Sequence, residues 1–414
     1  MLSITDIRVE KILKISDDYL CNIDSIRETF ETNYLFLHAN LENKRQSFSK
    51  FLNENNIKGI SDITSKHVKT IRTFITQIKR CEVATKIFPQ SMLVSLVSQY
   101  DYLIGLLIQY IYEINPQLLK DSNSQITYKD LFQFNNLDEI KDKIIKDKIE
   151  TVLRKSHEEQ LIELQKIVGI ETLKPKSLWK DFVEITQRRN LLVHSKGCVS
   201  EQYIKSCQNA GVLINVSKGD FLDVDYKYFE RAYFVFYSLG VMLTQVISRH
   251  LLKDENLLGS IDTILNQIIY NTIEEEKYDL SIELSTFATN RNTKHSCRLD
   301  EVFFILNYAQ AYKWNGDLKK CEEVLSTFDF SAVTPDILIA KYTLEDNIEK
   351  IVENMLKIGS GGEIMTKEAY VTWPIFKEVR QNPRFIETYK NIFNEDLPND
   401  LLTKNENDIV NEYK

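Results

Sequence analysis

Apolar side chains recur at the helical period of about 3.6 residues along most of the chain, and this pattern predicts helices from end to end. Residues 1–80 are rich in charge, and Tyr19, Phe30 and Tyr34 fall on one helical face. We expect two or three amphipathic helices here, which pack on the rest of the molecule or provide a dimer or partner surface.

Two strongly apolar stretches predict long buried helices. The first runs from Leu93 to Ile114 and is interrupted by Ser98 and Asp101, which lie three residues apart and therefore share a face. The second runs from Tyr226 to Leu252. Between them, residues 137–168 alternate Lys and Glu around spaced isoleucines, a pattern typical of helices with a solvent-exposed face.

The helix predicted from Leu178 to His194 carries a charge where an aliphatic residue is expected. Arg189 lies in the middle of the apolar stripe of this helix, which consists of Leu178, Phe182, Ile185 and Leu192. Burying a guanidinium group is unfavourable by several kcal/mol unless an acid or an anion meets it. The helix is therefore predicted to be a functional site as well as a packing element.

The only β signal follows this helix. Residues Val212–Val216, the turn 217–220 and residues Phe221–Val224 predict a short hairpin. Beyond it, helix pairs recur, with Asp279 and Asp317 at equivalent turns roughly 38 residues apart. This region, residues 256–395, resembles tetratricopeptide-like repeats. Residues 396–414 are predicted to be an acidic tail.

Composition supports an all-α chain, because 12 Gly and 7 Pro in 414 residues leave few breakers of helices. A net charge of −8 gives no global attraction for nucleic acid, so an RNA site would need a local basic patch. The six cysteines show no C-x-x-C pair and no disulfide framework, as in a reducing cytosol. No signal peptide is recognised at the start, and we expect a cytoplasmic protein.

Membrane and metal sites are not expected. The apolar run 102–112 is too short to span a bilayer, and the run 232–248 contains polar residues, so both are interpreted as buried helices. His157 is followed by Glu158, but Leu161 stands where a zinc-protease motif needs its second histidine. No metal, no cofactor and no membrane partner is predicted.

The helix predicted from Leu178 ends with the pattern Arg-Asn-x-x-x-His, formed by Arg189, Asn190 and His194. The segment resembles the R-x4-6-H signature of the HEPN superfamily, helical domains found as ribonucleases in prokaryotic toxins and defence proteins. The resemblance covers residues 93–252. In such proteins a Ser-x-x-acid pair often occurs on the helix that packs against the motif helix, and Ser98 with Asp101 matches it.

The resemblance implies a metal-independent endoribonuclease. Histidine suits the two proton transfers near neutral pH, and arginine suits the phosphate. We assign His194 as general base or acid, Arg189 as phosphate clamp, and Asn190 as the group that orients His194 or the phosphate. On one regular helix Arg189 and His194 point about 140° apart. Either the helix end unwinds or a second copy contributes, and the resemblance implies a homodimer with facing motif helices.

Supporting roles go to Ser98 and Asp101, and to Arg188 and Lys196 as contacts for flanking phosphates. Each has a simpler interpretation. Arg188 and Lys196 also fit solvent-facing charges, which residues of this kind more often are. His194 fits a residue that interacts with the helix dipole, and Arg189 fits a buried ion pair with Asp101.

The sequence therefore predicts an all-α protein: N-terminal amphipathic helices (1–85), a HEPN-like bundle with a short β-hairpin (86–255), helix-hairpin repeats (256–395) and a tail (396–414). The first functional hypothesis is an RNA-cleaving toxin or antiviral defence effector, dimeric through the HEPN-like domain, with a protein partner or sensor at the repeats. The second is a non-catalytic module that binds RNA or nucleotide and serves as an interaction scaffold. A third is a regulator silenced by a paired nucleotidyltransferase.

Overall fold

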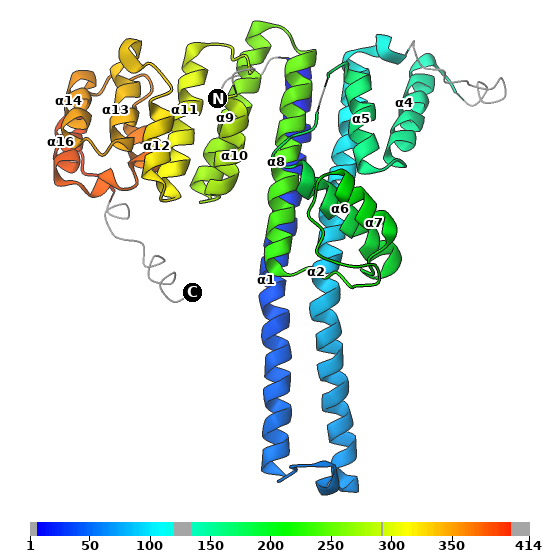
Figure 1. The fold of residues 1–414 in the computed structure, drawn as a ribbon. Coiled ribbons are helices and arrows are strands. Elements are labelled where there is room, and N and C mark those ends of the chain that lie inside the picture. The colour runs from blue at the N-terminus through cyan, green and yellow to red at the C-terminus, as the bar shows by residue number, and fades with distance from the viewer. Residues whose placement is uncertain (1–5, 120–133, 172, 291–292, 399–414) are drawn as a thin grey trace. The chain divides into compact units, whose positions relative to one another are not determined.

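The computed structural model describes residues 6–119, 134–171, 173–290 and 293–398. These residues are almost entirely helical and contain no strand, which confirms the predicted all-α class. The chain divides into two compact units, residues 1–253 (unit 1) and residues 254–414 (unit 2). Figure 1 shows the helices of each unit.

The described residues of unit 1 form three long helices and four shorter ones. They are α1 (Ile7–Glu54), α2 (Ser65–Ile114), α4 (Leu137–Leu153), α5 (His157–Val168), α6 (Trp179–Ser195), α7 (Glu201–Asn209) and α8 (Tyr226–Leu251). Two 3-10 turns, Ile60–Asp62 and Pro116–Leu119, follow α1 and α2. Helix α2 continues through residues 85 and 86 without interruption, so the N-terminal helices share a unit with the motif helix.

The core of unit 1 lies where the first part of α1, the second part of α2 and α8 meet. Tyr100 and Phe236 are fully buried there, with ring centroids 5.4 Å apart. Helix α8 approaches α1 closely at Gly240, where an added Cβ would lie 2.1 Å from the Tyr19 ring. The Tyr19 hydroxyl donates a hydrogen bond to the Phe236 carbonyl at 2.8 Å. The Tyr19 ring of α1 therefore packs directly on the backbone of α8 where the two helices cross.

Helix α2 is the one described helix that is long and apolar enough to cross a membrane by length and composition alone. Most of its apolar residues between 93 and 111 are buried against other helices of unit 1. The buried residues of α2 lie mainly in this second part, whereas its first part follows α1 in a two-helix hairpin (Figure 1).

We call this hairpin, residues 31–88, the arm. Only Leu41, Ile57 and His67 of the arm are buried. Aromatic rings hold its two helices together, with Phe74 of α2 lying 5.3 Å from Phe48 of α1. No other described helix of unit 1 covers the arm along most of its length, so within this unit both helices expose a long face (Figure 1).

The predicted hairpin at residues 212–224 is absent. Residues 212–216 form no ladder with residues 221–224; instead their side chains at 212, 214 and 216 pack on a small cluster around Tyr203 and Cys207 of α7. The backbone of residues 219–222 pairs with residues 197–199, giving an isolated antiparallel bridge between Cys198 and Phe221. The alternating apolar pattern is satisfied by packing on helices and needs no partner strand.

Unit 2 contains three successive helix pairs. They are α9 (Glu255–Glu274) with α10 (Tyr278–Ala288), α11 (Arg298–Trp314) with α12 (Leu318–Leu325), and α13 (Pro335–Leu344) with α14 (Ile348–Ile358). Each pair turns at a residue in the left-handed region, Glu276, Gly316 or Asp346. The residue after it donates a hydrogen bond to a carbonyl five residues back, at 2.8 to 2.9 Å. The three turns are thus structurally equivalent.

The last described part of unit 2 is less regular. It comprises 3-10 turns at Pro374–Phe376 and Val379–Gln381 and the helices α15 (Lys367–Thr372) and α16 (Pro383–Phe393), whereas a further 3-10 turn, Phe330–Ala332, lies between α12 and α13. Its core includes Tyr370, Phe376 and Phe385, all fully buried. Most of the predicted tail, residues 399–414, lies outside the described residues.

Candidate functional site

Helix α6, which carries the Arg-Asn-x-x-x-His motif, ends just after it. Lys196 and Gly197 adopt left-handed backbone conformations, with φ of 50° and 83°. The Gly197 N–H donates to the Leu191 carbonyl at 3.0 Å, which closes the helix end. A Cβ at Gly197 would lie 2.5 Å from the Leu222 carbonyl oxygen, so the position requires glycine. The motif therefore occupies the last turns of a regular helix.

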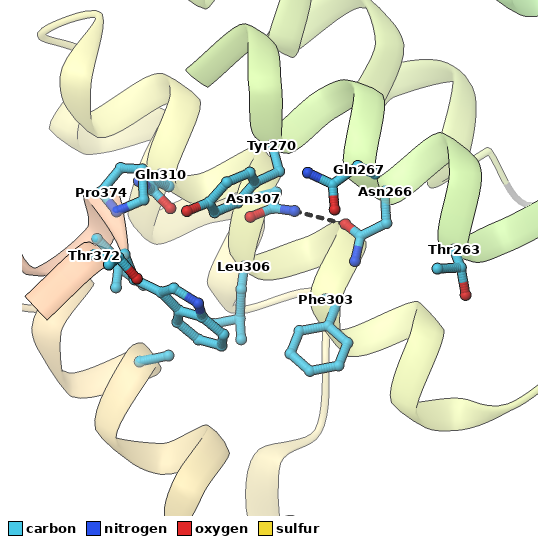
Figure 2. Close-up of a pocket in the computed structure, with 13 residues that line it drawn as sticks. Thr263, Asn266, Gln267, Tyr270, Phe303, Leu306, Asn307, Gln310, Thr372 and Pro374 are labelled. Carbon is cyan, nitrogen blue, oxygen red and sulfur yellow. Dashed lines mark hydrogen bonds between the residues drawn. The ribbon is translucent and has the colours of Figure 1, made fainter. Parts of the chain in front are cut away.

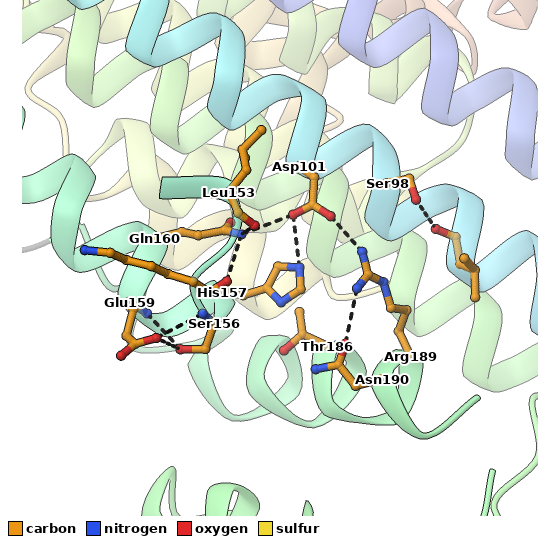
Figure 3. A network of polar contacts seen from close by, with 12 residues as sticks. Ser98, Asp101, Leu153, Ser156, His157, Glu159, Gln160, Thr186, Arg189 and Asn190 are labelled. Carbon is orange, nitrogen blue, oxygen red and sulfur yellow. Dashed lines mark hydrogen bonds and ion pairs between the residues drawn. The ribbon is translucent and has the colours of Figure 1, made fainter. Parts of the chain in front are cut away.

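Arg189 meets an acid within the otherwise apolar face of α6. Its Nη2 donates to Asp101 Oδ2 at 2.7 Å, and its Nη1 donates to Asn190 Oδ1 at 3.2 Å (Figure 3). The Arg189 and Asp101 side chains are 20% and 24% exposed. Arg189 Nε is buried and finds no acceptor among the described residues. The structure thus brings together two residues that the sequence pattern pairs.

A second helix reaches the same carboxylate. His157 Nε2 of α5 lies 3.1 Å from Asp101 Oδ1, and Gln160 Nε2 donates to that oxygen at 3.4 Å (Figure 3). Both side chains are buried. In the sequence, His157 stands out only as part of an incomplete zinc motif, and nothing marks Gln160. The helical spacing of His157 with Leu161 was the available signal, since it places the imidazole on the buried face of α5.

The environment of Asp101 keeps it charged. Burial alone raises the pKa of this carboxyl, but its interactions with His157, Arg189 and Gln160 outweigh burial, and the pKa lies below its ordinary value. Asp101 is therefore an anion at neutral pH and provides the countercharge that Arg189 needs inside the helix interface.

Arg188 points into a different cluster. Its Nε donates to Glu184 Oε1 at 2.8 Å, its Nη1 donates to the Asp223 carbonyl at 2.9 Å, and its guanidinium lies 3.9 Å from the Tyr228 ring centroid. The hydroxyls of Tyr203 and Tyr228 both donate to Glu184 at 2.7 Å. Burial and the Glu184 charge raise the pKa of Tyr228 well above its ordinary value. This cluster links α6 to α7 and α8. The Arg188 side chain is bound within it and does not project freely into solvent.

The remaining predicted residues lie at the surface. His194 and Lys196 are exposed at the C-terminal end of α6, and His194 makes no hydrogen bond or ion pair with a described residue. Ser98 is exposed and its hydroxyl donates to the Val94 carbonyl at 2.8 Å. The structure of one copy therefore joins Asp101, Arg189 and Asn190 in one network and leaves His194 outside it.

Unit 2 contains a separate pocket of about 360 Å³. One face of the helix pairs lines it with aromatic and amide side chains (Figure 2). Among them, Asn307 Nδ2 donates to Asn266 Oδ1 at 2.6 Å, and Tyr270, Phe303 and Trp373 add aromatic surface. The lining includes no charged side chain. Its polar groups are therefore amides and hydroxyls.

Within the described part of the chain, no three His, Cys, Asp or Glu side chains form a group that could hold a metal ion. No protein-family model, curated protein or solved structure matches the chain.

Proposed function

We propose that unit 1 is a metal-independent endoribonuclease of the HEPN type. The observation that carries the proposal is the pairing of Arg189 with Asp101. An arginine of the motif helix is held within an interface by an acid from α2, and Asn190 of the motif accepts its second hydrogen bond. A guanidinium group presents five N–H donors, and only two of them are used here, so donors remain for a phosphate.

In the proposed reaction the 2′-hydroxyl of RNA loses its proton and attacks the adjacent phosphorus. The bond from phosphorus to the 5′-oxygen breaks, and that oxygen takes a proton. His194 serves as the general base or acid in these transfers, and Arg189 stabilises the charge on the phosphorane. The products are a 2′,3′-cyclic phosphate and a 5′-hydroxyl. Asn190 orients the phosphate or His194.

A second copy of the chain completes the proposed site. Helix α6 stays regular through Ser195, so Arg189 and His194 point about 140° apart in one copy. The alternative of an unwound helix end has no support in this geometry. The exposed position of His194 suits a residue that acts on RNA held by Arg189 of the facing copy, in a homodimer.

The proposal is tested by incubating a cellular RNA pool with purified protein in EDTA. We expect fragments that end in 2′,3′-cyclic phosphate from the wild type and none from His194→Ala. Arg189→Lys keeps the positive charge beside Asp101 but loses the planar fork, and is expected to lose most activity without unfolding. Cleavage by His194→Ala at the wild-type rate would refute the assignment.

Mixing the two inactive variants tests the composite site. If Arg189 of one copy acts with His194 of the other, each mixed dimer of His194→Ala with Arg189→Lys holds one intact site. A 1:1 mixture should then recover about a quarter of wild-type activity once subunits exchange, since half of the dimers are mixed and each has one of two sites. A site contained in one copy predicts no recovery.

A second candidate is a non-catalytic module that binds RNA or nucleotide. It is favoured by one observation, namely that Arg189 is engaged in a network while His194 stands outside it. In that case, phosphate binding depends on Arg189 far more than on His194, and no cyclic-phosphate ends appear. The same two variants therefore separate the hypotheses.

The biological role is part of the proposal. We place the protein in the cytoplasm as a toxin or antiviral defence effector, as the motif resemblance implies. The helix pairs of unit 2 are proposed to bind a protein partner or sense a trigger, and the amide-lined pocket supports this because it offers hydrogen bonds and aromatic surface to a ligand. Substitutions that fill this pocket are expected to change how RNA cleavage is regulated and to leave the cleavage reaction itself unchanged.

A further inference from the structure

The first part of α2 is strongly basic in an acidic chain. Residues 65–90 contain six Lys or Arg residues and one acid, whereas the whole chain has a net charge of −8. The six cations are Lys66, Lys69, Arg72, Lys79, Arg80 and Lys86. All six are exposed, and none forms an ion pair with another described residue. The single acid, Glu82, is paired with Arg45 of α1 at 2.9 Å.

These cations lie on one side of the helix. Counted at about 100° per residue, they fall within an arc of roughly 160° on the side away from α1. The opposite side carries Phe74, whose ring lies near the rings of Phe48 and Phe51 of α1. From Lys66 to Lys86 the row extends over about 30 Å. We call it the basic face of the arm.

The basic face leads toward the candidate site along the same helix. Asp101 follows Lys86 by 15 residues of α2, about 22 Å along the axis. In an ideal helix Ser98 and Asp101 fall within the arc of the six cations. Helix α6, which carries Arg189, packs on α2 at this level. A polyanion that follows the basic face therefore arrives at Arg189.

We infer that the basic face of the arm is a docking surface for the phosphate backbone of RNA. The inference rests on the proposed function for the identity of the polyanion and adds the surface that holds the substrate before cleavage. Charge complementarity carries it, since unpaired cations in a row release counterions when phosphates replace them. Lysines and arginines that contact only phosphates bind RNA without recognising its base sequence.

Two other occupants fit the basic face less well. A symmetric contact with a second copy would place the same cations opposite one another, which is repulsive. An anionic membrane would require a continuous apolar side on the exposed face. The exposed apolar residues there, Val68, Ile75, Val83 and Ile87, are interspersed with the cations, while the larger apolar side of the helix faces α1.

Binding of a fluorescein-labelled U20 RNA tests the inference. It is measured by anisotropy with the full chain, in EDTA, in a His194→Ala background so that the RNA stays intact. Six phosphate contacts predict that the logarithm of the association constant falls with log[KCl] with a slope of about −4. The affinity should therefore fall about 250-fold between 50 and 200 mM KCl. Replacing the six cations by Gln should reduce the slope to near zero and weaken binding at least about 100-fold at 50 mM. Gln has a helix propensity close to that of Lys, so α2 is retained.

A matched control removes six charges elsewhere. It replaces exposed lysines outside the arm by Gln, namely Lys14, Lys146, Lys205, Lys227, Lys253 and Lys319. This control should keep the wild-type slope, as should a variant in which the four arm lysines become Arg. Equal losses in the arm and control variants would overturn the inference, because net charge alone would then explain binding.

Three further outcomes would also overturn it: arm-dependent binding to vesicles of phosphatidylserine and phosphatidylcholine without binding to U20, unchanged U20 binding by the arm variant, or loss of self-association on arm neutralisation with RNA affinity unchanged. The inference and the proposed function fail separately. Arm-dependent RNA binding without cyclic-phosphate products in the cleavage assay would refute the ribonuclease and leave the docking surface standing.

Discussion

Replacing Asp101 by Asn removes the charge that holds Arg189 and leaves the shape of the side chain unchanged. Asp101 Oδ2 accepts from Arg189 at 2.7 Å, and Oδ1 lies 3.1 Å from His157 Nε2. In the variant an amide N–H replaces one of these two oxygens and faces either Arg189 Nη2 or Gln160 Nε2, so at least one donor loses its acceptor. We expect the folded state of unit 1 to lose stability, with α6 affected first.

The magnitude follows from the exposure of the pair. Breaking a fully buried ion pair costs about 3–5 kcal/mol, and an exposed pair contributes about 0–1 kcal/mol. With both side chains about one-fifth to one-quarter exposed, we expect Asp101→Asn to lower the free energy of unfolding by about 2 kcal/mol. Asp181→Asn is the control, because it also removes an acid that pairs with an arginine of unit 1, but its partner Arg231 is 63% exposed. It should cost less than about 1 kcal/mol.

Tryptophan fluorescence can report on unit 1 alone. The three tryptophans are Trp179, at the start of α6, and Trp314 and Trp373 in unit 2. In a background where Trp314 and Trp373 are replaced by Phe, urea unfolding monitored by Trp179 follows the helix that carries Arg189. Adding Arg189→Gln completes a double-mutant cycle, for which we expect a coupling energy of about 1–2 kcal/mol.

If Asp101→Asn is no more destabilising than Asp181→Asn and the coupling energy is below about 0.5 kcal/mol, the Asp101–Arg189 ion pair does not stabilise unit 1. Arg189 would then be held by the remaining contacts of α6, and the acid from α2 would have no share in positioning it. A large effect of Asp101→Asn without coupling to Arg189 would transfer the role to His157, whose imidazole lies on the other carboxylate oxygen.

Three further predictions concern stability. Because the pKa of Asp101 is lowered in the folded protein, its contribution is present above about pH 4 and is lost as the pH falls through the folded pKa, so unfolding free energies of wild type and Asp101→Asn should converge below pH 4. Gly240→Ala should lower the melting temperature, since overpacking against Tyr19 costs about 1–3 kcal/mol and exceeds the gain in helix propensity; Gly259→Ala, whose Cβ would lie 3.4 Å from its nearest neighbour, should not. Gly197→Ala should lower the urea midpoint by an amount equivalent to about 2 kcal/mol, because it combines a positive φ with a backbone clash.

Helical periodicity was sufficient to predict the class of the fold, and its failures have physical causes. The alternation at residues 212–216 has the period of a strand, but these side chains pack on α7, and periodicity alone does not identify the packing partner. The repeat in unit 2 is weak in sequence because only Gly316 marks its turn with a glycine. Glu276 and Asp346 adopt the same left-handed conformation without that marker.

The candidate site was predictable where it depends on one helix and unpredictable where it depends on several. The position of Arg189 in an apolar stripe required an acid, and Asp101 was the candidate on the neighbouring helix. His157 reaches the same carboxylate from α5; its spacing with Leu161 indicates a buried position but does not identify the partner on α2. Arg188 was interpreted as a phosphate contact or a solvent-facing charge, but the segment after α6 folds back and places Asp223 and Tyr228 around it.

The basic face and Asp101 lie on one uninterrupted helix, and this fixes their rotational phase. Inserting a single residue between Lys86 and Asp101 would turn the arm by about 100° and move it about 1.5 Å along the axis, so its cations would no longer point toward α6. Inserting seven residues would restore the direction to within about 20° and lengthen the arm by about 10 Å. Changes in the length of α2 are therefore tolerable only in steps close to whole helical turns. The length of α2 between Lys86 and Asp101 sets both the distance and the direction of the basic face relative to Asp101.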